Sequence, residues 1–163
     1  MSGKAKFGIF GDGKELAQIA LAKVIRPGDF RSGYYRDQTL AFALGVIDQA
    51  QFFAQLYANA NVQADPMTAG RAMVGHFITR SLNPDSSWRP LTQQVNFSPD
   101  VSPTAAQMPR LVGLGHASRL YRELPDLAAL TQFSNRGAEI AIGTIGNAEH
   151  QNVTIGKAGR NRH

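Results

Sequence analysis

The chain has 163 residues, 43% hydrophobic and 18% charged, which suits one globular domain with a real core. It contains no cysteine, which excludes disulfides, thiolate metal sites and a cysteine nucleophile. The net charge of +5 suits an anionic ligand, whereas the lack of a basic run or aromatic-interleaved basic stripe argues against nucleic-acid binding. No apolar run reaches about 18 residues and the short polar N-terminus is no signal peptide, so we expect no membrane span and a cytoplasmic location.

The first part of the chain predicts helices separated by a short extended segment. Apolar periodicity predicts a helix over residues 15–24, which ends at Arg26-Pro27-Gly28. Its expected buried face carries Leu16, Ile19, Ala20 and Val24. Residues 29–36 are predicted to be extended, and residues 40–58 to be a long helical stretch with a break near Gly45.

The second part combines a long irregular stretch with a helix and a strand. Residues 59–100 lack periodicity and are rich in Gly, Pro, Asn and Ser, which is typical of functional loops. Residues 104–124 predict a helix, and residues 139–145 predict a strand that is apolar without strict alternation. The order of elements predicts an α/β fold, with helices flanking a mostly parallel sheet in which strand 139–145 is central.

A glycine-rich segment near the N-terminus leaves one alternative open. Residues Gly8 to Lys14 match the first part of a phosphate-binding P-loop. The next position should offer a hydroxyl to a metal ion, but it is Glu15, and little chain precedes the motif to form its strand. A P-loop-like nucleotide binder is therefore the remote alternative to a glycine turn that leads into a helix.

Two motifs carry candidate ligand-binding side chains. In Tyr34-Tyr35-Arg36-Asp37, Arg36 is a candidate bidentate phosphate clamp and the Tyr35 hydroxyl a second donor, whereas the alternative is an Arg–Asp pair at the surface. The segment Gly-Arg-Ala-Met-Val-Gly-His-Phe, from Gly70 to Phe77, contains His76. A lone histidine is more often structural than catalytic, so that interpretation also stays open.

Two further motifs follow. The segment Ser-Pro-Thr-Ala-Ala-Gln-Met-Pro, from Ser102 to Pro109, predicts a helix start with Ser102 as N-cap and Pro103 at the first helical position. Such a helix start also favours a polar or anionic ligand nearby. Gly146-Asn147-Ala148 follows the predicted strand, where a turn places Asn147 at the end of the sheet.

In this order the four motifs resemble the alpha-type half of the thiamine-diphosphate-dependent 2-oxo acid dehydrogenases, of the pyruvate and branched-chain type. The family has Gly-Arg-Gln-Met-x-x-His-Tyr, then Ser-Pro-Leu-Ala-Thr-Gln-x-Pro, then a triplet such as Gly-Asp-Gly. The resemblance covers roughly residues 6–148. It implies a thiamine-diphosphate-binding fold with the following site: Tyr35 and Arg36 at the cofactor diphosphate, His76 as the catalytic residue lining the pocket, Ser102 and Thr104 at the aminopyrimidine, Gly146 beside the diphosphate, and Asn147 as ligand to Mg²⁺.

The resemblance also implies an activity and its partners. It implies oxidative decarboxylation of a 2-oxo acid, with transfer of the acyl group to a lipoyl group on an acyltransferase. Thiamine diphosphate and Mg²⁺ lie between the alpha-type half and a beta-type half, and the full-length form is an oligomer. Asn147 keeps an oxygen ligand but lacks the negative charge of the family's acidic residue, so a Mg²⁺ site here would be weaker.

The resemblance stops after Ala148, where the family continues with small residues and Glu-Gly. The sequence therefore predicts a partial, truncated cofactor-binding domain over residues 1–148 and a polar, basic, disordered tail over residues 149–163. We expect the chain by itself to lack decarboxylase activity and to bind thiamine diphosphate only weakly. The alternative function is that of a non-catalytic remnant with a structural or interaction role.

Overall fold

The computed structural model describes residues 11–72, 75–134, 141–146 and 151–156. The helices are α1 (Glu15–Ala22), α2 (Gln38–Ala43), α3 (Gln49–Leu56) and α4 (Gln107–Glu123), with 3₁₀ turns η1 (Leu91–Gln93) and η2 (Pro125–Leu127). The strands are β1 (Phe30–Ser32), β2 (Asn96–Phe97), β3 (Ala141–Gly146) and β4 (Gln151–Gly156). No helix within these ranges is long and apolar enough to cross a membrane.

The strands form one sheet in the order β2-β1-β3-β4. β1 pairs in parallel with both β2 and β3, whereas β3 and β4 are antiparallel. The predicted α/β architecture and the interior position of the strand before Gly146 are thus confirmed. Part of the segment expected to be a disordered tail forms strand β4, because its backbone pairs with β3 from Ala141↔Gly156 to Gly146↔Gln151.

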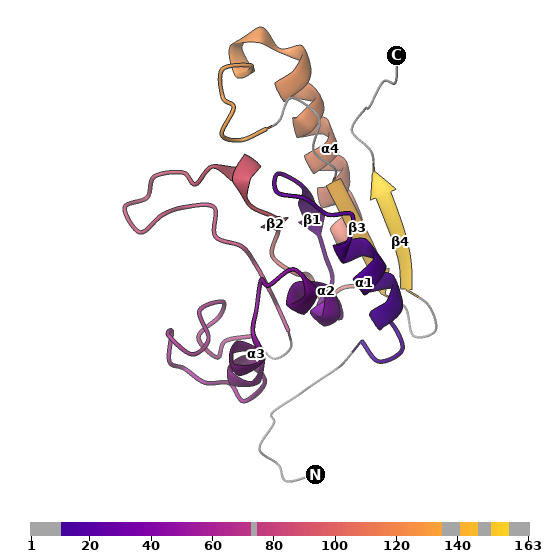
Figure 1. Ribbon diagram of the computed structural model, residues 1–163, viewed down its shortest axis with the longest axis vertical. Coiled ribbons are helices and arrows are strands. Elements are labelled where there is room, and N and C mark those ends of the chain that lie inside the picture. The colour runs from indigo at the N-terminus through magenta and orange to yellow at the C-terminus, as the bar shows by residue number, and fades with distance from the viewer. Residues whose placement is uncertain (1–10, 73–74, 135–140, 147–150, 157–163) are drawn as a thin grey trace.

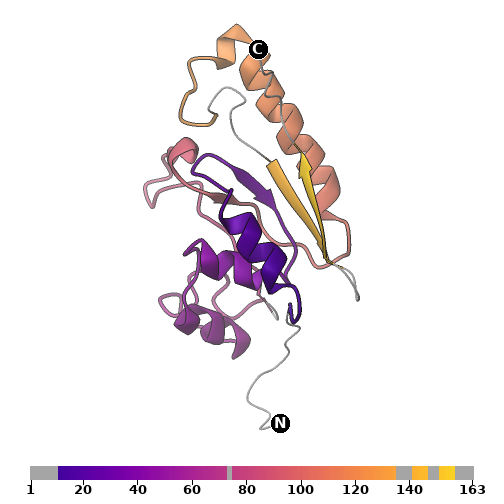
Figure 2. The same cartoon turned by 45° about the vertical axis from the view of Figure 1, so that its right-hand side comes forward.

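Helix α4 packs along β1, β3 and β4, and α1 packs against α2 (Figure 1). Figure 2 shows α4 running beside the two long strands, while α3 and the loop after it lie at the opposite end of the molecule. The main core forms where α1, α2 and β2 meet the segment around Phe77, and its buried members are Leu21, Ile25, Leu40, Ala41, Ile47, Phe77 and Phe97. Phe97 of β2 belongs to this core, and β2 pairs with β1, whose C-terminal end leads into the candidate site.

The predicted helix over residues 40–58 is two helices. Gly45 adopts a φ of +66°, a left-handed conformation that glycine reaches without strain, and this ends α2. Asp48 then begins α3 through a capping box, in which its carboxylate accepts from the Gln51 N–H at 2.8 Å and the Gln51 side chain accepts from the Asp48 N–H. The break expected at Gly45 is confirmed.

The predicted buried face of α1 is wrong. Leu16, Ile19 and Val24 are 82%, 44% and 52% exposed, whereas Gln18 and Leu21 are buried. Gln18 is drawn inward because its amide donates to the Arg36 carbonyl at 3.1 Å and accepts from the Leu40 N–H at 2.9 Å. Two long-range hydrogen bonds therefore orient the helix, in place of its apolar periodicity.

Candidate functional site

The turn after β1 presents the first motif. The Tyr34 N–H donates to the Asp37 carboxylate at 3.1 Å, and the Asp37 N–H donates to the Tyr34 carbonyl at 3.0 Å. These bonds close a turn in which the rings of Tyr34 and Tyr35 lie 4.2 Å apart, and both side chains are buried. The turn fixes the directions in which Tyr35 and Arg36 leave the sheet.

His76 lies directly against this turn and against the third motif. Its Nε2 is 2.9 Å from the Ser102 Oγ, and its ring stacks on that of Tyr35 at a centroid distance of 6.2 Å and an interplanar angle of 19°. Three motifs that are far apart in the sequence thus meet through the side chains of Tyr35, His76 and Ser102.

Gln55, on α3, holds the backbone of His76 and was not identified from the sequence. Its amide nitrogen donates to the His76 carbonyl at 3.2 Å, and its amide oxygen accepts from the His76 N–H at 2.8 Å. A buried amide that bonds both groups of one residue restricts that residue's position. The only sequence signal for Gln55 is a polar residue among the apolar positions of a helix.

Arg36 supplies positive charge beside the two tyrosines. Its guanidinium carbon lies 5.9 Å from the Tyr34 ring centroid and 5.6 Å from that of Tyr35, and its Nη2 is 3.5 Å from the Tyr35 hydroxyl. Its Nε is buried and has no hydrogen-bond partner, and Arg36 makes no ion pair among the described residues. A buried guanidinium nitrogen without a partner is costly, so this group suits an anion.

Thr104 and Tyr34 complete the cluster. Burial raises the pKa of the Tyr34 hydroxyl, a hydrogen bond with Tyr35 raises it further, and a hydrogen bond with the Thr104 side chain opposes the shift. Tyr34 therefore stays a neutral donor and acceptor at physiological pH. Thr104 thus reaches the cluster through its side chain.

A buried ion triad lies beneath these residues. The Arg31 guanidinium pairs with Asp37 on one side, Nη2 to Oδ2 at 2.5 Å, and with Asp100 on the other, Nη1 to Oδ1 at 2.5 Å. Both contacts are ion pairs between buried side chains. The interpretation of Asp37 as half of a surface Arg–Asp pair is therefore wrong, because Asp37 is 1% exposed and its partner is Arg31.

Asp100 links the triad to the site. Its Oδ2 accepts from the Phe77 N–H at 2.8 Å, next to His76, and it lies two residues before Ser102. Burial raises the pKa of Asp100 to about 7, Arg31 lowers it and Asp37 raises it. For Arg31, burial lowers the pKa, but the two carboxylates together raise it above its ordinary value. Neither Arg31 nor Asp100 was identified from the sequence.

The predicted helix start at Ser102 is wrong. Helix α4 begins at Gln107, with Ala106 at the N-cap and Pro109 in the first turn. Ala105 has a φ of +67°, which no helical residue adopts, so residues 102–106 form turns instead. The Ser102 hydroxyl is consequently directed to His76 rather than to the helix backbone.

The last motif lies partly outside the described residues. Gly146 is the final residue of β3, while Asn147, the predicted Mg²⁺ ligand, and Ala148 are outside the described ranges. Within those ranges no group of three His, Asp or Glu side chains is arranged to hold a metal ion.

In the described part of the glycine-rich segment before α1, the Gly11 and Lys14 amides are bonded within the fold. The Gly11 N–H donates to the Gln38 side chain at 3.1 Å, and the Lys14 N–H donates to the Gly11 carbonyl at 2.9 Å. A P-loop needs such amides directed at the ligand. The structure therefore favours the glycine turn over the P-loop for the described part of this segment.

The chain is similar to 2-oxoisovalerate dehydrogenase subunit alpha of Bacillus subtilis (strain 168), with 33% identity over 141 residues. The aligned region is 83% of this chain but 37% of that relative, so the chain spans little more than a third of the relative's length. No protein-family model matches the chain. The chain is thus related in sequence to the alpha subunit of a 2-oxo acid dehydrogenase.

Proposed function

We propose that this chain provides the alpha-type surface that holds thiamine diphosphate in the oxidative decarboxylation of a 2-oxo acid. The observation that carries the proposal is the contact of His76 with Ser102 and Tyr35, with Arg36 alongside. These residues come from three separate segments, each of which matches a motif of the family. The similarity to a 2-oxoisovalerate dehydrogenase alpha subunit supports the same assignment.

The described residues fit the anionic end of this cofactor. The unpartnered Nε of Arg36 and the adjacent Tyr35 hydroxyl offer two kinds of donor to a diphosphate. A guanidinium binds phosphate oxygens bidentately, and such charge-assisted bonds are about twice as strong as neutral ones. We assign diphosphate binding to Arg36 and Tyr35. The sequence prediction that Gly146 lies beside the diphosphate and that Asn147 binds Mg²⁺ is kept as part of the proposal.

The cofactor, when bound, supplies the electron sink for decarboxylation. The protein's own contribution is to orient it and to hold protons near it. His76 shares a hydrogen bond with the Ser102 Oγ, so a proton can be held between the His76 Nε2 and that oxygen. The Tyr35 ring lies nearly parallel to the imidazole at a centroid distance of 6.2 Å, which helps to orient the His76 ring. A beta-type half and a lipoyl-bearing acyltransferase are the partners that we propose.

Saturation-transfer NMR with thiamine diphosphate and Mg²⁺ tests the proposal on the purified chain. We expect weak but saturable binding, and Arg36→Ala should weaken it at least about tenfold, the scale of a hydrogen bond to a charged group. Arg26→Ala, which removes an exposed arginine outside the site, is the matched control. Equal affinity of Arg36→Ala and wild type, or an equal loss in both variants, would overturn the assignment of Arg36.

A further inference from the structure

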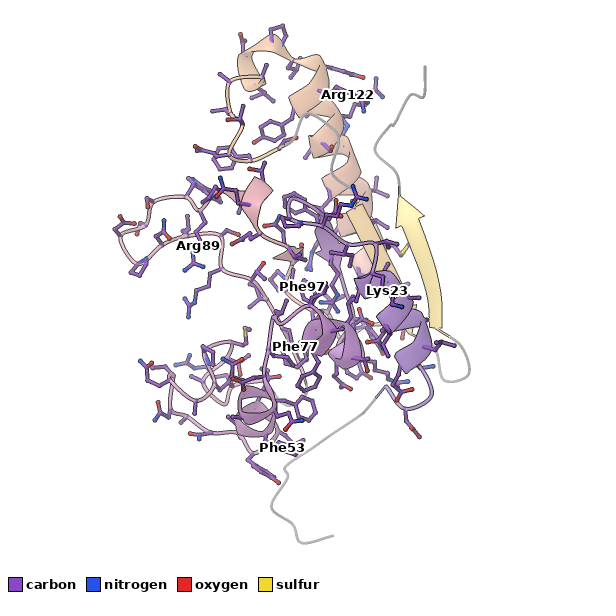
Figure 3. The ribbon with its side chains drawn as sticks, in the orientation of Figure 1. Lys23, Phe53, Phe77, Arg89, Phe97 and Arg122 are labelled. Atoms are coloured by element: carbon purple, nitrogen blue, oxygen red, sulfur yellow. The ribbon has the colours of Figure 1, made fainter. Side chains whose placement is uncertain are left out.

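A second basic region lies away from the cluster around His76, on the loop between Phe77 and β2. Two open hollows, of about 370 and 680 Å³, adjoin there and share four lining residues, Ile78, Thr79, Arg80 and Arg89. Neither contains a residue of the first site. Figure 3 shows Arg89 on this loop, at a distance from the core residues Phe77 and Phe97.

One guanidinium nitrogen of Arg89 is buried without a hydrogen-bond partner. This nitrogen is the Nε, and the Arg89 side chain makes no hydrogen bond or ion pair among the described residues. The backbone at this point is nevertheless fixed, because the Arg89 N–H donates to the Ser81 carbonyl at 2.9 Å and the Asn83 N–H to the Ser87 carbonyl at 2.9 Å. A buried unpaired donor on a fixed backbone is uncommon and suggests a missing acceptor.

Arg80 is positioned beside it. Its Nη2 donates to the Pro66 carbonyl at 3.1 Å, and its own carbonyl accepts from the Gln94 amide at 3.1 Å. One guanidinium nitrogen is thus used to hold the side chain in place. Among the described lining residues of the two hollows there is no Asp or Glu, and neither arginine makes an ion pair with a described residue.

We propose that Arg80 and Arg89 form a second binding site, for a small molecule that carries a phosphate or carboxylate group. Two guanidinium groups at one hollow match the geometry of such anions, which accept paired hydrogen bonds. Hollows of a few hundred Å³ are the size of small-molecule sites. Because both arginines line hollows, a small anion fits this region better than the flat surface of an acidic protein.

The test uses Trp88, the single tryptophan of the chain and the neighbour of Arg89, as a fluorescent reporter. Inorganic phosphate and succinate are titrated separately at constant ionic strength, which distinguishes the two anion sources. We expect a saturable change in Trp88 fluorescence with at least one of them. Arg89→Gln and Arg80→Gln should each weaken that binding about tenfold or more, as for loss of a hydrogen bond to a charged group.

A matched variant and a polyanion complete the design. Arg26→Gln removes the same charge from an exposed position elsewhere and should leave the fluorescence titration unchanged. Circular dichroism confirms that each variant is folded. The proposal fails if neither anion saturates, if Arg26→Gln weakens binding as much as Arg89→Gln, or if only polyglutamate binds, since that would indicate an acidic macromolecule.

Discussion

Replacing Asp100 with asparagine should change how the stability of the protein depends on pH. The pKa of Asp100 is raised to about 7 in the folded chain, first by burial. In the unfolded chain the ordinary value is 3.8. Between these values the folded state binds the proton and the unfolded state does not, so the free energy of unfolding falls as pH rises.

The size of this effect follows from the two pKa values. Each pH unit between them lowers the free energy of unfolding by about 1.4 kcal/mol. Above the folded pKa, Asp100 is deprotonated in both states and adds no further pH dependence. From about pH 5 to about pH 8 the free energy of unfolding should therefore fall by about 2–3 kcal/mol. Protonated Asp100 and asparagine have the same shape, and both can accept from the Phe77 N–H. Asp100→Asn should thus resemble wild type in acid and should not lose stability through this pH window.

The assay is urea unfolding monitored by Trp88 fluorescence at several pH values, with the free energy extrapolated to water. The informative quantity is the difference in the free energy of unfolding between wild type and Asp100→Asn, followed as pH changes. Other titrating groups affect both proteins alike and cancel in this difference. Asp126→Asn, which alters an exposed carboxylate, should give a curve parallel to that of wild type. If the difference between wild type and Asp100→Asn stays constant over this range, or if wild type gains stability relative to the variant as pH rises, the reasoning is refuted.

Three further substitutions test the core, a helix cap and a loop by the same urea unfolding. Leu40→Ala, at a fully buried position, should cost about 2–5 kcal/mol, whereas Leu16→Ala, 82% exposed, should stay within about 0.5 kcal/mol; similar losses would contradict the core assignment. Asp48→Ala removes the capping box of α3 and should cost about 1 kcal/mol, and an unchanged midpoint would show that the cap is unimportant. Gly70→Ala should cost about 2 kcal/mol or more, because φ is +73° and the new Cβ would meet the Ala58 carbonyl oxygen at 2.7 Å; a neutral result would mean that the loop rearranges.

The sequence predicted much of the local structure. Helix positions, the break at Gly45 and the interior strand before Gly146 follow from apolar periodicity and from the conformational freedom of glycine, which act over a few residues. The motifs also identified Tyr35, His76 and Ser102 as residues of interest, and the structure brings these three into contact. Their roles toward a cofactor stay predictions.

Only the tertiary structure decided which polar groups are buried and what they bind. Gln18 takes the inward face of α1 because its partners come from residues 36 and 40, and Arg31 is buried because Asp37 and Asp100 approach it from two loops. Gln55 contacts His76, which lies 21 positions further along the chain. A buried polar group is stable only when its partners are present, and those partners are distant in the sequence. The sequence by itself therefore determined the approximate positions of the helices, the break at Gly45 and the residue types of the motifs, while the long-range hydrogen bonds and ion pairs determined how the site is assembled.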